Sequence, residues 1–119
     1  MQTFAHPDGS ALISLDISDP ANPVELDRLS LDEEWTPHWI SMEPAGDRIV
    51  VTSGHGSTLY RVLVARLDPQ TGKLALDSTF RSPGSETPGV GFDRTSWPHG
   101  EAGSAMPHGA VFARAEATE

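Results

Sequence analysis

The stretch that decides the fold is PHWISMEPAGDRIVVT, residues 37–52, which contains two apolar segments on either side of a turn. His38–Met42 is apolar enough for a short strand, and Arg48–Thr52 is rich in β-branched residues, which favour strands. Glu43–Asp47 lies between them and contains the proline and glycine that typically end a strand. The stretch therefore predicts two consecutive strands joined by a tight turn.

Further short strands are expected on both sides of this stretch. Each candidate alternates apolar and polar residues or forms a short apolar run bounded by turn residues. The expected strands are Ala11–Ile17, Val24–Leu31, Leu59–Leu67, Lys73–Phe80 and Ala110–Ala113. The residues from Arg81 to Pro107 are rich in Gly, Pro and Ser without a clear period, which predicts a functional or disordered loop. We therefore expect an all-β, antiparallel fold.

The length and charge of the chain limit its core and its partners. With 119 residues, the chain has room for one small core. Its 17 Asp and Glu against 8 Lys and Arg give a formal net charge of -9, which repels phosphates and anionic lipids. We therefore expect no nucleic-acid partner and no membrane partner, and a cation is the more natural small ligand.

Cysteine usage and the N-terminal residues leave the compartment of the protein open. The chain has no cysteine, so disulfides and thiolate metal sites are excluded. No apolar run approaches the ~20 residues of a membrane helix. Residues 1–7 lack the basic start and the apolar stretch of a signal peptide. We therefore expect no targeting signal.

An internal repeat is the most informative feature, because self-similarity at a fixed period indicates a stacked or radial architecture. Three pairs of segments recur at an offset of about 49 or 50 residues. The pairs are Asp19–Pro20 with Asp68–Pro69, Val24–Asp27 with Leu74–Asp77, and His6 with His55. Pro37–Trp39 recurs as Pro107–Gly109 at an offset of about 70, which is this period plus an insertion of roughly 20 residues.

The repeat predicts β-propeller blades, because such a blade has four short antiparallel strands and repeats at a similar length. On this basis the chain divides into four parts. These are the outer strands of a first blade at 1–36, a complete blade at 37–81, a long insertion loop at 82–106, and the first strand of a further blade with a frayed tail at 107–119.

Two segments resemble known propeller families. Residues 37–52 resemble the repeat unit of lactonase-like and YVTN-repeat propellers, in which a Pro-His-Gly strand, a Pro-Asp-Gly turn and a Tyr-Val-Thr-Asn strand follow one another. Residues 15–24, LDISDPANPV, resemble a segment of the LVIVD-repeat propellers, which are related to selenium-binding-protein-like propellers. The chain departs from the repeat unit at Trp39, where glycine is usual, and at Glu43 and Ala45 in the turn.

The resemblance also implies that the repeats seen here are part of a larger assembly. Complete propellers of these families have about seven blades, and a blade sheet needs neighbours to cover both of its faces. We therefore expect the chain to be the C-terminal part of a larger propeller or a protomer that completes a ring by self-association. The remaining blades or further copies are its expected macromolecular partners.

The repeat places the five histidines of the chain at related positions. His38 and His108 open the innermost strands of consecutive blades, whereas His6 and His55 lie in loops that emerge on the same rim. His99 lies on the long insertion, which could fold over that rim. Because neutral imidazole suits zinc, copper, nickel or iron, His38, His108, His55 and His99 are the candidate ligands of a divalent transition metal. Alternatively, each histidine fastens its own loop by a hydrogen bond and binds no metal.

Three functions remain open from the sequence. The first is a binding scaffold with a histidine-lined metal or small-molecule site on one rim. The second, implied by the resemblance, is a lactonase-like hydrolase or a metal-dependent oxidase whose site is completed by other blades. The third is an interaction module that holds a protein partner with its long loop. The chain lacks the common nucleophile, phosphate-loop, metalloprotease and dinucleotide motifs, so no catalytic residue is assigned.

Overall fold

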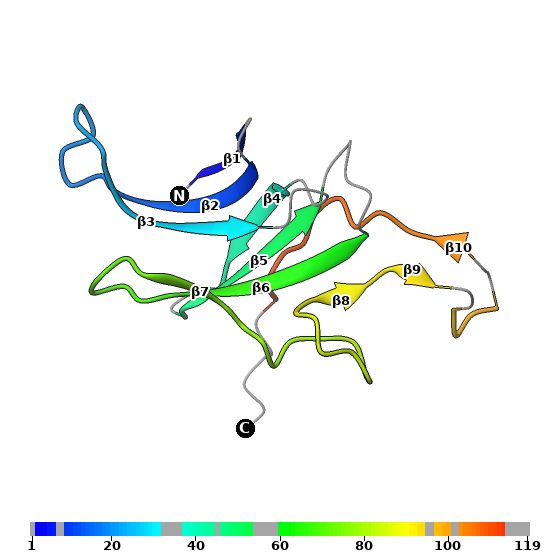
Figure 1. Cartoon of the computed structure of the whole chain (residues 1–119). Coiled ribbons are helices and arrows are strands. Elements are labelled where there is room, and N and C mark those ends of the chain that lie inside the picture. The colour runs from blue at the N-terminus through cyan, green and yellow to red at the C-terminus, as the bar shows by residue number, and fades with distance from the viewer. Residues whose placement is uncertain are drawn as a thin grey trace, which may run out of the picture.

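The computed structural model shows an all-β protein built from antiparallel sheets, as expected from the sequence (Figure 1). The part of the chain that the structure describes contains no helix and so no helix that could cross a membrane. The backbone alone is described at 2–6, 9, 93, 94 and 104. The described residues are 2–6, 9–31, 37–44, 46–53, 60–94, 97–100 and 103–113.

The first sheet has three strands in the order β1-β2-β3. These are β1 (Gln2–His6), β2 (Gly9–Asp16) and β3 (Val24–Leu31). The strands β2 and β3 match the two expected strands closely. The turn between them is closed by a hydrogen bond from the Asn22 N–H to the Asp19 carbonyl. The sheet has one strand more than expected, because β1 forms a hairpin with β2 in which His6 pairs with Gly9.

The second sheet contains the two strands predicted from residues 37–52. Its main path runs β4-β5-β6-β7, and β8 pairs with the first two residues of β6, Arg61 and Val62. The strands are β4 (Pro37–Met42), β5 (Arg48–Ser53), β6 (Arg61–Leu67), β7 (Leu74–Leu76) and β8 (Val90–Gly91). The expected antiparallel pairing of β5 with β6 is confirmed. The strand β7 is shorter than expected because Asp77 begins a turn, in which it accepts hydrogen bonds from Thr79 and Phe80.

The C-terminal third differs from the sequence-based expectation at two places. The segment expected as a loop includes β8 and also a short hairpin of β9 (Asp93–Arg94) and β10 (Gly103–Ser104). The strand expected at Ala110–Ala113 is not formed. The carbonyl groups of His108 and Ala110 instead accept hydrogen bonds from side chains of the second sheet, and no described strand pairs with this segment.

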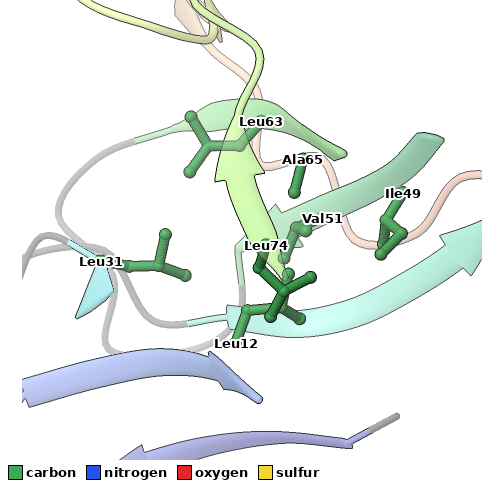
Figure 2. Close-up of a cluster of buried hydrophobic side chains, with 7 residues drawn as sticks. All are labelled: Leu12, Leu31, Ile49, Val51, Leu63, Ala65 and Leu74. Carbon is green, nitrogen blue, oxygen red and sulfur yellow. The ribbon is translucent and has the colours of Figure 1, made fainter. Parts of the chain in front are cut away.

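One hydrophobic core joins the two sheets (Figure 2). Leu12 on β2 and Ile49 on β5 are both fully buried, and they belong to the same cluster. Within β5 the apolar side chains alternate, so Ile49 and Val51 face this core. The complete cluster comprises Leu12, Leu31, Ile49, Val51, Leu63, Ala65 and Leu74. Because the first sheet lies with β1 against β4 and β3 against β7, each sheet covers one face of the other.

The hairpin between β6 and β7 is fastened to the first sheet by two hydrogen bonds. The Ser14 hydroxyl donates to the Gly72 carbonyl at 2.5 Å, and the Leu74 N–H donates to the Asp27 carboxylate at 2.7 Å. Gly72 has a φ of 77°, and a Cβ atom there would lie 2.5 Å from the Leu26 side chain. Glycine at this position therefore allows the hairpin to approach β3 closely.

The Asp27 carboxylate makes the junction between the sheets sensitive to pH. Hydrogen bonds from the N–H groups of Leu74 and then Arg28 lower the pKa of Asp27. A lowered pKa in the folded state stabilises the fold above the unfolded value of about 3.9, and this contribution is lost as the pH falls through the folded pKa.

We expect Asp27→Asn to lower the melting temperature at a pH of about 7, because asparagine keeps an acceptor oxygen but loses the charge. The difference from the wild type should shrink as the pH falls from the unfolded pKa of about 3.9 through the lowered pKa of the folded state, below which the wild-type carboxyl is also neutral. Thermal unfolding of the two proteins, followed by circular dichroism at a pH of about 7 and again below the folded pKa of Asp27, measures this difference. An equal difference at both values would contradict a role for the charge of Asp27.

Candidate functional site

The candidate site consists of His38 and His108, whose side chains meet although 70 positions separate them in the sequence. Their Nε2 atoms lie 2.9 Å apart, and the ring centroids lie 4.6 Å apart in an edge-to-face arrangement. Both histidines are exposed. The two histidines that the sequence predicts to be equivalent thus form one pair on the surface.

A β-bulge at the start of β4 places His38 at this position. The register of β4 with β5 shifts between Pro37, which pairs with Ser53, and Trp39, which pairs with Thr52. The extra residue is His38, which has no opposite partner in the ladder. Because a bulge turns a side chain away from strict alternation, His38 and Trp39 can both lie on the side of the sheet that carries Thr52 and His108.

Two side chains of the second sheet hold the segment that carries His108. The Thr52 hydroxyl donates to the His108 carbonyl at 2.8 Å, and the Trp39 indole N–H donates to the Ala110 carbonyl at 3.0 Å. Thr52 is fully buried, whereas Trp39 is half-exposed. The backbone at His108 and just after it is therefore held against the second sheet, which positions the ring against His38.

The structure places one other candidate histidine, His99, against a tryptophan instead of in this pair. His99 stacks on Trp97, with ring centroids 6.4 Å apart. Among the described residues, no three His, Cys, Asp or Glu side chains are grouped to hold a metal ion. His55 lies outside the described residues, and His6 is described only by its backbone at the end of β1.

Two carboxylates with lowered pKa values, Glu43 and Asp68, lie in turns rather than beside the histidine pair. The Arg48 guanidinium lowers the pKa of Glu43, and the Gln70 N–H, followed by Thr71, lowers the pKa of Asp68. Glu43 and Asp68 belong to the β4–β5 and β6–β7 turns, at the end of the second sheet opposite to His38. These carboxylates therefore stabilise turns and are not candidate partners of the pair.

Several residues of the site were not expected from the sequence. The local sequence does not predict the hydrogen bond of Thr52 or the bulge at His38, because both roles depend on a segment far along the chain. Ser53 is fully buried, and its hydroxyl has no hydrogen-bond partner among the described residues. The position of Trp39 was marked only by its departure from the glycine that is usual in the repeat.

The comparisons with known proteins give no relative that would identify the site. No protein family, no curated protein and no solved structure matches the chain. The fold and the site define the protein as an all-β protein with two packed antiparallel sheets and an exposed histidine pair.

Proposed function

We propose that the chain is part of a β-propeller of the YVTN- and LVIVD-repeat type, which serves as a binding scaffold and holds a divalent transition metal between His38 and His108. The contact between these two rings is the observation that carries the proposal. A pair of imidazole nitrogens on an accessible surface is the donor set that zinc, copper, nickel and iron share.

The packing of the two sheets supports the propeller part of the proposal. The strands β1, β2 and β3 follow one another as β5, β6 and β7 do, and β3 lies against β7. Consecutive blades pack face to face in this way, with outer strands against outer strands and inner strands against inner strands. The strand β4 is then the innermost strand of its blade. His38 lies at the start of this strand, close to the propeller axis.

The distances within the pair fit two ligands of one metal. In a square-planar copper or nickel site, two adjacent nitrogens bound at about 2.0–2.1 Å with an angle near 90° at the metal lie about 2.9 Å apart. If each ring centre lies roughly 1.1 Å behind its nitrogen, the ring centres in such a complex are about 4.5 Å apart. The structure has 2.9 and 4.6 Å for these two distances. The rings therefore need little rearrangement to hold a metal.

Two histidines leave the other coordination positions of a metal open. Catalytic and ligand-binding metal sites keep such open positions, whereas structural sites are closed by protein ligands. The metal would act there as a Lewis acid for a bound ligand. Both rings would bind a metal through Nε2 as neutral donors, so the ring that now donates from Nε2 would carry its proton on Nδ1 instead.

Metal titration of the wild-type protein tests this proposal. We expect one equivalent of Cu²⁺ to bind per chain and to bind more tightly than Zn²⁺, in line with the general order of affinities. Isothermal titration calorimetry gives the stoichiometry, and elemental analysis of the purified protein gives its native metal content. A protein that is purified free of metal and ignores added Cu²⁺, Ni²⁺ and Zn²⁺ would refute the metal site.

A further inference from the structure

The first sheet ends in a strand that is paired on one side only among the described residues, whereas the corresponding strand of the second sheet is paired on both sides. Within the described residues, β1 pairs with β2 and with no other strand. By the period of the repeat, β1 corresponds to β5, and β5 pairs with β6 on one side and with β4 on the other. The first sheet therefore lacks a counterpart of β4.

The segment 107–113 is the counterpart of β4 in the sequence, but it forms no ladder in the structure. Pro107–Gly109 repeats Pro37–Trp39, the start of β4. The segment contacts the second sheet through its His108 and Ala110 carbonyls, and no described strand pairs with it. The Val111 side chain is 83% exposed, although it lies in an apolar run. The chain thus carries both a strand-like segment without a ladder and an edge that lacks that strand.

We propose that the segment 107–113 of one copy of this chain pairs with the free edge of β1 in a second copy. This inference rests on the proposed propeller architecture, since it uses the correspondence between β1 and β5. The addition would give the first sheet a fourth strand in the place that β4 has in the second sheet. Because one copy gives its segment and another gives its edge, the contact is head to tail and leads to a ring or an open chain of copies.

The repeat also predicts the register of the contact. Trp39 pairs with Thr52 in the second sheet. Gly109 corresponds to Trp39, and Thr3 corresponds to Thr52 at the repeat offset of about 49 residues. The proposed contact therefore places Gly109 of one copy opposite Thr3 of the next copy in an antiparallel pair.

Engineered cysteines test this register, because the chain has no cysteine of its own. One full-length chain carries Thr3→Cys, and a second chain with a different tag carries Gly109→Cys. Opposite residues on paired strands have Cα atoms about 4.5–5.5 Å apart, which is within the range of a disulfide. We expect mild oxidation of the mixture to give mainly the disulfide-linked pair of the two tagged chains.

In the matched control, the second chain keeps Gly109 and carries Ala113→Cys, four positions further along the same segment. In the proposed register this cysteine lies roughly 13 Å further from Thr3, beyond the reach of a disulfide. We expect little cross-linked product from this mixture. Equal cross-linking by both cysteine positions would show that the contact has no register and would overturn the proposal.

The mass of the unmodified protein gives a second, independent readout. We expect light scattering to show assemblies larger than the 12.8 kDa chain, with the average mass rising with concentration. A monomer at every concentration, together with no cross-link at Gly109→Cys, would overturn the inference. Metal uptake needs only His38 and His108 of one chain, so a monomer that binds Cu²⁺ would leave the proposed metal site intact.

Discussion

Replacing Leu12 by alanine is expected to lower the free energy of unfolding by about 2–5 kcal/mol. Leu12 is fully buried on β2, and it belongs to the cluster that contains Ile49 and Val51 of the second sheet. The substitution removes apolar contacts and leaves a cavity between the two sheets, where neither sheet can close it without moving against the other. Chemical denaturation followed by circular dichroism measures the change.

Ile17→Ala is the matched control for Leu12→Ala. Ile17 follows β2 directly, but its side chain is 61% exposed, so its truncation should change the free energy of unfolding by no more than about 0.5 kcal/mol. If Leu12→Ala were as mild as this control, the two sheets would not share a core in solution. The proposed stacking of consecutive blades would then lose its structural basis.

His38→Ala and His108→Ala are each expected to abolish the uptake of Cu²⁺ by the wild-type protein. Either substitution leaves a single imidazole, which cannot hold the metal by two nitrogens. The loss of affinity should exceed the roughly 10–100-fold that follows loss of a residue that only supports a ligand. Both rings are exposed, so the fold should be retained, and the circular dichroism spectrum checks this.

His99→Ala is the control for these two variants, because His99 stacks on Trp97 and not on the pair. It should bind Cu²⁺ as the wild type does. The competing hypothesis is that each ring of the pair only fastens its own segment. It predicts a loss of stability of about 1–3 kcal/mol in each alanine variant and no metal in the wild type. Metal binding that survives both alanine substitutions would place the site elsewhere.

Much of the fold follows from local sequence patterns. The alternation in Val24–Leu31 and the β-branched run Arg48–Thr52 predicted strands that the structure contains, because alternate side chains of a strand face opposite sides of its sheet. The repeat also singled out His38 and His108 as equivalent positions, and the structure brings these two side chains together. Whether they bind a metal is still a prediction.

Other features depended on contacts between distant segments. No local pattern predicted β1, which needs β2 beside it. A strand was predicted at Ala110–Ala113, where no described partner completes a ladder. Strand propensity describes a residue's fit to a sheet, but backbone pairing requires a neighbouring strand in register.

The sequence by itself determined the all-β class and most of the strands, and it predicted that His38 and His108 occupy equivalent positions. Only the tertiary structure decided how the two histidines meet, because their contact depends on a bulge in β4 and on the hydrogen bond from Thr52 to the His108 carbonyl. It also decided that His99 lies against Trp97 instead. A repeat fixes which positions are equivalent, whereas packing across 70 residues fixes where their side chains point.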